Sequence, residues 1–234
     1  MSAQKGFVIA MDGPVAAGKG TVAPALAVHL GGFYLYTGAT YRALALYCIQ
    51  HHIDVTDREA VLTALEKVDV DLYDHTVILN GQDITEAIRR ADVANAVPKV
   101  ALLPEVRKKM VALQQSIANK RIAEGRIVVI EGRDTATVVF PDAPIKIFLT
   151  ASAEIRARRR LEQYQSQGMT EATFEHVLND LQERDRQDME REVDPLVSDP
   201  EAHGYTVVDN GSLNEEQTID TIVQLIRERN LFND

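Results

Sequence analysis

The sequence predicts an α/β fold in which a parallel sheet is flanked by helices and carries a small antiparallel insert. Short apolar runs alternate with longer stretches of helical periodicity, a pattern typical of such sheets. One region departs from the alternation and has a two-residue period instead. The chain has 234 residues, 45% of them hydrophobic, so it is long enough for one domain with a small insert.

Four apolar runs are expected to form central strands of the sheet. Side chains on both faces of each run are apolar, which indicates burial by helices on either side. The runs cover residues 7–11, 127–131, 145–149 and 205–209. Their alternation with helical stretches favours a doubly wound parallel arrangement.

Two apolar stripes with helical spacing predict helices between and after these strands. Pro104 opens the first helix, because proline suits the first helical turn. The first stripe consists of Val106, Met110, Leu113 and Ile117, and the second of Ile219, Ile222, Val223 and Ile226. A further helix is expected near residues 171–191.

Residues 68–84 have the two-residue period of exposed strands. Turn signals lie at Asp74-His75 and at Asn80-Gly81. This segment predicts a small antiparallel sheet inserted into the α/β core. The chain shows no proline- or serine-rich linker, so the insert is expected to pack against the core.

The composition excludes several classes of function. Lys and Arg number 25 against 35 Asp and Glu, a net charge of −10, which disfavours binding to a nucleic-acid polymer or an anionic membrane by bulk charge. The single cysteine, Cys48, cannot form an internal disulfide. The first apolar run is too short for a signal peptide or a membrane-spanning helix. We therefore expect a cytoplasmic protein.

The first predicted strand leads into a glycine-rich loop and then a helix. Gly13, four further residues, Gly18 and Lys19 have P-loop spacing in the strand–loop–helix context that the motif requires. Backbone N–H groups and the helix N-terminus are expected to hold phosphate oxygens, while Lys19 bridges the outer phosphates. The expected ATP-binding residues here are Gly13, Pro14, Val15, Ala16, Ala17, Gly18, Lys19, Gly20 and Thr21. The sheet is thus expected to be of the P-loop NTPase type.

Three further motifs carry arginines. They are Thr37-Gly38-Ala39-Thr40-Tyr41-Arg42, Glu131-Gly132-Arg133-Asp134 followed by Thr137-Val138-Val139-Phe140-Pro141, and Arg184-Asp185-Arg186-Gln187-Asp188-Met189-Glu190-Arg191. Together with the P-loop, these motifs closely resemble the bacterial cytidylate (CMP) kinase family of nucleoside monophosphate kinases. The resemblance runs along nearly the whole chain. It implies the reaction ATP + CMP ⇌ ADP + CDP, with dCMP as a second acceptor, and a monomeric enzyme.

The resemblance also implies a division of the single kinase domain, residues 1–234. The core comprises residues 1–38, 108–152 and 200–234, and the insert that binds the nucleoside monophosphate comprises residues 39–107. A mobile lid and helical arm cover residues 153–192. Within the lid, Arg156 and Arg160 are expected to fold over the ATP phosphates, because they share a helix face.

Individual acceptor-binding residues follow from the same resemblance. Arg42, Arg133 and Arg191 match positions that hold the phosphate of CMP, Arg184 and Asp188 match the pair that holds its sugar, and Arg107 and Asp134 match groups that recognise cytosine. Thr37 and Tyr41 complete the expected CMP-binding set. Lys19 joins the three phosphate-binding arginines as the expected catalytic group. Cytosine presents an amino donor beside ring acceptors, so a carboxylate and an arginine complement it, whereas uracil turns an oxygen toward the carboxylate.

Mg²⁺ is expected to accompany ATP as co-substrate. Thr21, Asp12 and Glu131 lie where they would contact the ion indirectly, through water. In-line phosphoryl transfer depends on positioning and charge neutralisation, which agrees with many arginines and no catalytic triad.

The sequence departs from the family pattern at several positions. Tyr36 stands where the family usually has Asp, Pro98 where a Ser usually contacts cytosine, Glu131 for Asp, Ala136 for Gly, and Val15-Ala16 for a Ser-Gly pair. None of these changes removes an arginine of the phosphate set. Pro98 does remove a hydroxyl from the expected base pocket.

Other interpretations remain open at this level. A P-loop kinase for another acceptor, such as UMP, AMP or a small metabolite, is the nearest, and a catalytically silent ATP-binding regulatory protein is the second. A GTPase is disfavoured because no Asn-Lys-x-Asp-like segment follows a core strand. The arginines also have structural alternatives: solvent-exposed side chains, a salt-bridge ladder through Arg184, Asp188 and Arg191, and a helix cap at Asp134.

Overall fold

The computed structural model describes residues 6–73, 76–166, 168–169 and 171–229. Its main sheet has five parallel strands in the order β2-β6-β1-β7-β8. The strands are β1 (Val8–Asp12), β2 (Phe33–Tyr36), β6 (Val128–Glu131), β7 (Ile145–Thr150) and β8 (Thr206–Asp209). The predicted parallel α/β fold is confirmed.

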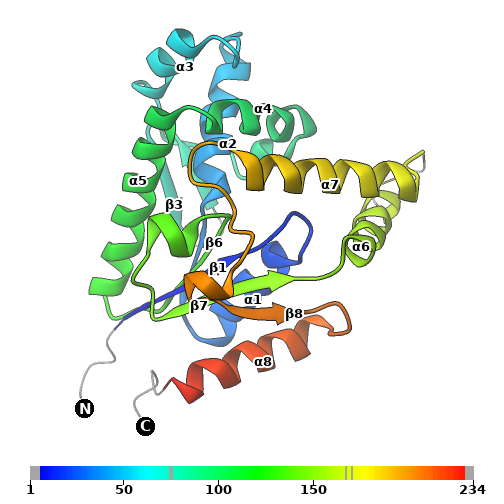
Figure 1. The fold of residues 1–234 in the computed structure, drawn as a ribbon. Coiled ribbons are helices and arrows are strands. Elements are labelled where there is room, and N and C mark those ends of the chain that lie inside the picture. Colours follow the sequence, from blue (N-terminus) through cyan, green and yellow to red (C-terminus); the bar gives the residue numbers. More distant parts are fainter. Residues whose placement is uncertain (1–5, 74–75, 167, 170, 230–234) are drawn as a thin grey trace.

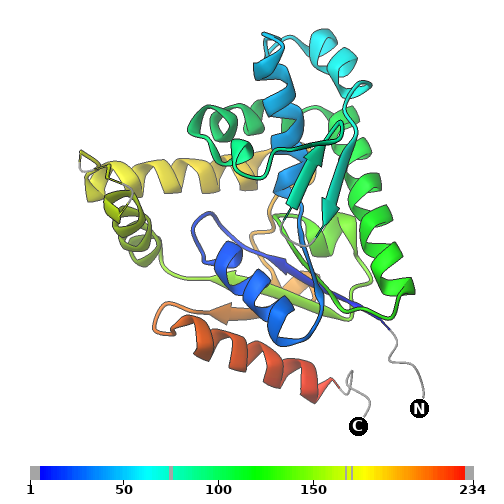
Figure 2. The same ribbon diagram turned by 180° about the vertical axis from the view of Figure 1, so that it is seen from behind.

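Helices cover both faces of this sheet (Figures 1 and 2). The helices α1 (Lys19–His29) and α8 (Glu215–Glu228) pack on one face, where the whole predicted stripe from Ile219 to Ile226 is buried. The other face is covered by α2 (Gly38–Gln50) and α5 (Pro104–Ala123). As predicted, Pro104 begins α5.

One strand differs from its prediction. The run at 205–209 was expected to be central, but β8 is an edge strand of the sheet. Val208 is buried against α8, whereas the side chain of Val207 is 38% exposed. The apolar run therefore reflects one buried face and not two. The strand β2, at the opposite edge of the sheet, was not among the four predicted strands.

The inserted sheet is confirmed. It has the order β3-β4-β5 and consists of β3 (Val70–Tyr73), β4 (Thr76–Leu79) and β5 (Gln82–Asp83). The two-residue turn Asn80-Gly81 joins the last pair with φ of 50° and 81°, as an Asn-Gly hairpin turn requires. The other predicted turn, Asp74-His75, lies outside the described residues. The sheet packs on the core together with the helices α3 (Arg58–Leu65) and α4 (Ala91–Ala101) and the short turn η1 (Ala87–Arg89).

Two further helices form an arm beside the P-loop. They are α6 (Ala153–Ser166) and α7 (Phe174–Glu190), and Figure 1 shows α7 extending back toward α2 and α4. Thr173 caps α7 by accepting a hydrogen bond from the His176 N–H. A small apolar cluster of Ala157, Val177 and Leu181 joins the two helices. The short helical turns η2 (Thr135–Val139) and η3 (Glu201–His203) complete the elements.

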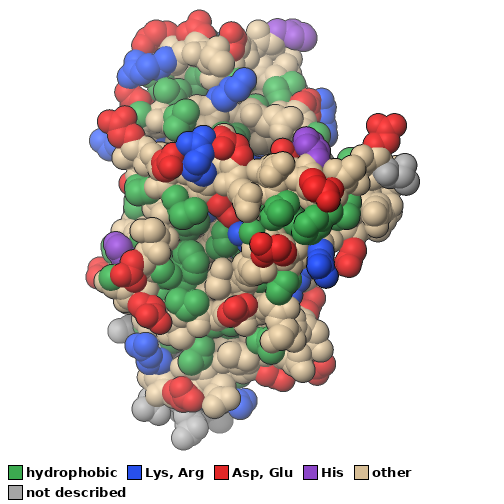
Figure 3. Space-filling view, turned by 45° about the vertical axis from the view of Figure 1, so that its right-hand side comes forward, with side chains coloured by type: hydrophobic (Ala, Val, Ile, Leu, Met, Phe, Trp, Pro, Cys, Tyr) green, Lys and Arg blue, Asp and Glu red, His purple; other side chains and the backbone are tan. Residues whose placement is uncertain are grey.

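The surface agrees with the acidic composition. On the face shown in Figure 3, acidic side chains are scattered, and Lys and Arg lie singly or in small groups. Several arginines are instead turned inward, and Arg107 and Arg156 are buried. No helix among the described residues is both long enough and apolar enough to cross a membrane.

Candidate active site

The backbone of the P-loop between β1 and α1 adopts positive φ angles at two glycines. Gly13 and Gly18 have φ of 145° and 93°, which residues with a side chain rarely adopt. A Cβ on Gly13 would lie 2.0 Å from the Leu149 carbonyl oxygen, so the loop passes directly against β7. Asn210, which follows β8, donates from Nδ2 to the Ala17 carbonyl at 3.0 Å and holds the other side of the loop.

Lys19 lies folded into this loop. Its Nζ donates to the carbonyl oxygens of Gly13 and Pro14 at 2.7 and 2.8 Å. Burial, together with the nearby charge of Arg133, lowers the pKa of Lys19 to about 7. The loop therefore holds a lysine that is poorly solvated, and anionic phosphate oxygens would favour its charged form.

A buried ion pair fixes the tip of the P-loop to the helical arm. Asp185 of α7 accepts from the Val15 N–H at 3.0 Å, and Arg156 of α6 donates to the Val15 carbonyl at 2.8 Å. The two side chains pair with each other at 2.7 Å. Arg156 was expected over the ATP phosphates, but its guanidinium is engaged here, with a further bond to the Ala151 carbonyl. We call these three residues the Val15 clamp.

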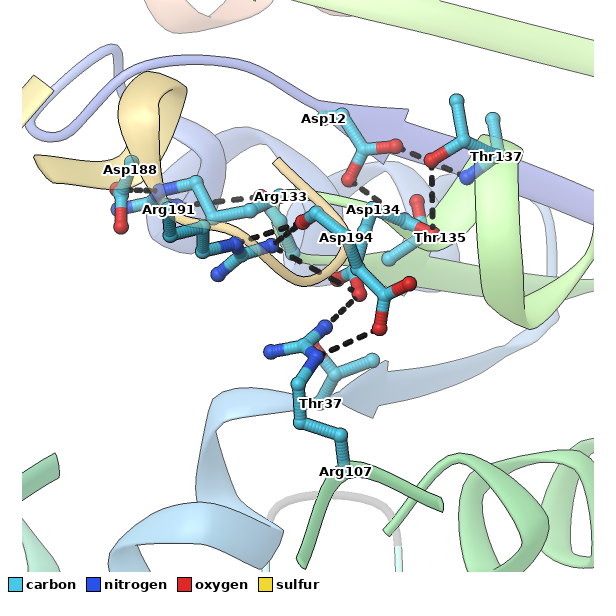
Figure 4. A network of polar contacts seen from close by, with 12 residues as sticks. Asp12, Thr37, Arg107, Arg133, Asp134, Thr135, Thr137, Asp188, Arg191 and Asp194 are labelled. Carbon is cyan, nitrogen blue, oxygen red and sulfur yellow. Dashed lines mark hydrogen bonds and ion pairs between the residues drawn. The ribbon is translucent and has the colours of Figure 1, made fainter. Parts of the chain in front are cut away.

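Asp12 is engaged in a similar way at the end of β1. Its carboxylate accepts from the N–H groups of Thr135 and Ala136, both at 2.9 Å, and from the Tyr205 hydroxyl at 2.7 Å. These three bonds fix the turn after Asp134 (Figure 4). Asp12 was expected to contact Mg²⁺ through water, and in this structure its carboxylate oxygens accept hydrogen bonds from the protein.

A second cluster of charged residues lies at the carboxyl end of the sheet. We call it the open cluster, because its Arg133–Asp188 pair is partly exposed, at 24% and 27%; it comprises Arg107, Arg133, Asp134, Asp188, Arg191 and Asp194. Arg107 of α5 pairs with Asp134, and its Nε donates to Asp194 at 2.6 Å. Arg191 lies 3.8 Å from the same Asp134 carboxylate and donates to the Asp194 carbonyl from Nε at 2.6 Å. Figure 4 shows these groups converging from α5, from the turn after β6 and from the segment after α7.

Burial raises the pKa of Asp134 to about 6, against the opposite effect of Arg107 and Arg191. The carboxylate is therefore ionised near neutral pH and flanked by two arginines. The predicted base-recognition pair, Arg107 and Asp134, is thus brought into direct contact.

The predicted phosphate-binding arginines lie along the same edge. Arg133 donates from Nε to Asp188 at 2.6 Å, and both side chains are about a quarter exposed, at 24% and 27%. Arg42 is held by neutral acceptors, the Tyr36 hydroxyl at 2.8 Å and the Ile88 carbonyl at 2.7 Å. Thr37, by contrast, donates its hydroxyl to the Glu131 carbonyl at 2.7 Å and serves the backbone.

Arg184, Asp188 and Arg191 were expected on one face of a helix. The helix α7 ends at Glu190, and Arg191 has extended backbone angles of −60° and 141°. Its side chain therefore turns toward Asp134 and away from the helix. Burial and the neighbouring Arg133 lower the pKa of Arg184, which indicates an arginine close to other positive charges.

Arg184 also lines a cavity of about 300 Å³ between the P-loop tip, α4 and the helical arm. Its polar lining residues include Arg160 and Asn95, and Val15 closes one wall. The P-loop lysine, the open cluster and this cavity thus lie together at the carboxyl edge of a parallel sheet, where ligands bind in such folds.

Comparison with known proteins agrees with this geometry. A family model described as cytidylate kinase matches residues 9–228. The chain belongs to the cytidylate kinase family. A cytidylate kinase of Klebsiella pneumoniae is 44% identical over 226 residues, covering 95% of this chain and 96% of that protein. A cytidylate kinase of Caldanaerobacter subterraneus subsp. tengcongensis is 42% identical over 219 residues, covering 94% of each. The chain is therefore a nucleoside monophosphate kinase.

A solved structure supports the fold alone. An uncharacterized protein from Eubacterium ventriosum superposes with a TM-score of 0.54 at 18% identity, covering 96% of this chain and 99% of that one.

The four arginines of α6, Arg156, Arg158, Arg159 and Arg160, lie in different environments. Arg156 belongs to the Val15 clamp, and Arg159 donates to the Asn210 side chain at 3.0 Å and to its carbonyl at 2.7 Å. Arg160 lies over the Tyr164 ring and lines the cavity. Arg158 is exposed. Of these four arginines, Arg160 is the one that lines the cavity.

The groups expected to contact Mg²⁺ differ in availability. Thr21 is exposed at the start of α1, and Glu131 is buried beside it, with Oε1 3.7 Å from the position of a Gly20 Cβ. Burial raises the pKa of Glu131, and the Tyr34 hydroxyl donates to it at 2.5 Å. Hydroxyl and carboxylate oxygens are donors that Mg²⁺ prefers, so Thr21 and Glu131 fit a nucleotide-bound ion, whereas Asp12 has its oxygens engaged.

Several residues of the site escaped sequence reasoning. Asp185 lies between two arginines in a charge run and resembled a solvent-exposed residue. Asp194 and Asn210 lie in irregular segments without a motif, and Tyr205 lies before an edge strand. The only signal in the sequence was the large number of acidic residues around the Arg-Asp-x-x-Asp-x-x-Arg motif. This signal does not identify the contact partner of any of these four residues.

Proposed function

We propose that this chain transfers the γ-phosphoryl group of ATP to CMP and to dCMP, giving CDP and dCDP. The observation that carries the proposal is the open cluster, in which Arg107 contacts Asp134 and Arg133 contacts Asp188 at the sheet edge that also bears the P-loop. The Arg133–Asp188 pair is partly exposed, at 24% and 27%, so Arg133 is suited to exchange its carboxylate for a nucleotide phosphate. The Arg107–Asp134 pair is buried, which suits it to hydrogen-bond a base and not a phosphate.

The donor nucleotide would be held by the P-loop. Its N–H groups and the N-terminus of α1 face the phosphates, and Lys19 leaves the carbonyls of Gly13 and Pro14 to contact them. Mg²⁺ bound to ATP would meet Thr21 and Glu131 and neutralise charge on the donor oxygens. Arg160 would reach the donor phosphates from the lid.

The acceptor base would lie against Arg107 and Asp134, with Tyr41 behind them. The Arg107 guanidinium lies 5.7 Å from the centre of the Tyr41 ring, which holds it in place. Asp134 would accept from the cytosine amino group, and uracil would place an oxygen against that carboxylate. Pro98 is exposed in α4, so the missing hydroxyl leaves the charged pair as the source of base selectivity.

The acceptor phosphate would meet Arg42, Arg133 and Arg191, and the sugar would meet Arg184 and Asp188. These groups would place the attacking oxygen in line with the γ-phosphorus, and positive charge would stabilise the transferring phosphoryl group. Residues 39–107 and 153–192 would close over the two nucleotides. Closure excludes water and limits hydrolysis of ATP.

The test is an ADP-release assay with ATP, Mg²⁺ and each of CMP, dCMP, UMP, AMP and GMP in turn. We expect rapid turnover with CMP and dCMP only. Equal turnover of UMP would contradict the base-recognition roles of Arg107 and Asp134. ATP binding without turnover of any acceptor would instead favour the regulatory interpretation.

A further inference from the structure

Tyr36 ends β2 at the carboxyl edge of the sheet, beside the open cluster. It pairs in register with Glu131 of β6. Its hydroxyl oxygen accepts the Nε–H of Arg42 at 2.8 Å. The phenol of Tyr36 therefore lies where the acceptor phosphate is proposed to bind.

The position of the ring is fixed by the backbone that follows it. A Cβ on Gly38 would lie 2.5 Å from Cε2 of the Tyr36 ring and 2.7 Å from its hydroxyl oxygen. No real Cβ comes that close, so the missing side chain of Gly38 creates the space for the ring. The hydroxyl is thus held against the start of α2, one turn before Arg42.

Arg42 differs from the other paired arginines of the cluster. Arg107 and Arg133 contact carboxylates, whereas the hydrogen bonds of Arg42 go to a phenol and to the Ile88 carbonyl. Neutral acceptors orient the guanidinium but leave its positive charge uncompensated. An anion can therefore bind Arg42 without displacing a carboxylate.

The hydroxyl proton of Tyr36 is itself available. The Tyr34 hydroxyl, on the same strand, donates to Glu131. Among the described residues, no acceptor for the Tyr36 proton is found, and the oxygen only accepts from Arg42. A phenol that accepts one bond still has one O–H to donate. A phosphate oxygen bound by Arg42 would be within reach of both groups.

We propose that Tyr36 is a further phosphate-binding residue, which donates its hydroxyl to the acceptor phosphate and orients Arg42 toward the same group. The inference rests on the proposed function, because it takes a nucleoside monophosphate as the ligand. A carboxylate at this position would orient Arg42 as well. It has no proton to donate at neutral pH and would repel the phosphate.

Calorimetric titration of the full chain with CMP and with cytidine tests this proposal. We expect Tyr36→Phe to weaken CMP binding about tenfold or more, because a hydrogen bond to a charged group is lost and Arg42 is released. Cytidine, which has no phosphate, should bind the variant as it binds the wild type. Tyr73→Phe, at a 51% exposed tyrosine on β3, is the matched control and should leave both affinities unchanged.

A second variant separates the two parts of the role. Tyr36→Asp keeps an acceptor for Arg42 but removes the donor, so we expect CMP binding at least as weak as in Tyr36→Phe. Wild-type affinity in Tyr36→Asp would contradict donation to the phosphate. Equal losses for CMP and cytidine in Tyr36→Phe would contradict a phosphate contact altogether.

The outcomes also separate this inference from the proposed function. If the wild type binds CMP and Tyr36→Phe binds it as tightly, only the inference is contradicted. If the wild type binds no nucleoside monophosphate, the proposed function fails and the inference fails with it. If the wild type prefers another nucleoside monophosphate, the affinities of wild type and Tyr36→Phe are compared for that monophosphate and for its nucleoside. A loss confined to the monophosphate supports the inference, and equal affinities of the two proteins contradict it.

Discussion

Two arginine–carboxylate pairs whose aspartates lie on the same helix differ in burial, and the difference decides which pair can exchange its partner. Asp185 and Asp188 lie three residues apart on α7 and pair with Arg156 and Arg133 at 2.7 and 2.6 Å. The first pair is closed in, with side chains 7% and 8% exposed, and the second is open, at 24% and 27%. Distance alone does not distinguish them.

Solvent access decides what each pair can do. In the Val15 clamp, both charges have lost their water and every partner is protein, so removing one leaves an uncompensated charge. In the open pair, water can replace either partner and a phosphate can replace the carboxylate, at low cost. The Val15 clamp is therefore built before ligands arrive, whereas the Arg133–Asp188 pair is built to exchange its contacts. The base-recognition pair Arg107–Asp134 is as closed as the clamp, at 3% and 11% exposed, so the exchange is confined to the phosphate end of the acceptor site.

The largest expected effect comes from breaking the clamp. Asp185→Ala should lower the free energy of unfolding by about 3–5 kcal/mol, because the buried Arg156 loses its counter-charge. Urea denaturation monitored by circular dichroism measures the change. A loss below about 1 kcal/mol would place this pair among ordinary surface pairs and contradict the contrast with Asp188.

Breaking the open pair should affect binding instead. Asp188→Asn is expected to change the free energy of unfolding by about 1 kcal/mol or less, since both partners are partly exposed. Its dissociation constant for CMP should rise about tenfold, because the sugar contact and the orientation of Arg133 are lost. Titration calorimetry and urea denaturation on the same preparation give both values. Large destabilisation with unchanged CMP binding would reverse the two roles.

A smaller effect concerns the proton on Lys19. Its pKa of about 7 in the free protein means that Lys19 is mostly neutral at pH 8.5, and phosphate oxygens favour the charged form. ATP binding at pH 8.5 should therefore take up about one proton. Titration calorimetry in two buffers of different ionisation enthalpy measures this number, and Lys19→Met should abolish it. Equal apparent enthalpies in both buffers would contradict the shift.

The same pKa predicts a pH dependence of stability without nucleotide. Between pH 7 and about 10.5 the unfolded chain holds a proton on Lys19 that the folded chain lacks. This group alone therefore makes the free energy of unfolding rise with pH across that window. Comparing the wild type with Lys19→Met at pH 7 and pH 9 isolates its contribution.

The smallest expected effect is at Arg186, an exposed arginine with two exposed glutamate partners. Arg186 on α7 contacts Glu183 and Glu190 at 2.8 and 2.7 Å, but its side chain is 57% exposed. Arg186→Gln should leave both CMP binding and the free energy of unfolding unchanged within the error of the measurements. It serves as the control for both α7 variants. A loss comparable to that of Asp185→Ala would show that burial is not the deciding variable.

The sequence predicted the parts of the fold that depend on local pattern. The P-loop spacing, the Asn80-Gly81 turn and the stripe of α8 are each set within a few residues, and the structure agrees with them. The central position expected for 205–209 was wrong, because an apolar run does not say how many neighbours a strand has. The end of α7 before Arg191 was also missed.

The site was predictable as a list of residues but not as a set of contacts. Arg107 and Asp134 were expected to act together on the base, and they are in contact. Asp188, expected to act with Arg184, forms its ion pair with Arg133. The long-range partners Asp185 and Asp194 were not expected, because they reach their arginines only through the tertiary fold. The same holds for Asp12, because the sequence did not indicate the three hydrogen bonds that it accepts from the protein.

The most direct test of the acceptor site is the selectivity of Asp134→Asn. The ratio of kcat/KM for CMP over UMP should be measured for wild type and variant at pH 8, where Asp134, with a pKa of about 6, is ionised. We predict that the ratio falls by about tenfold or more, because an amide can donate to uracil where the carboxylate only accepts. An unchanged ratio would show that Asp134 does not contact the base and would contradict the open cluster as the CMP site.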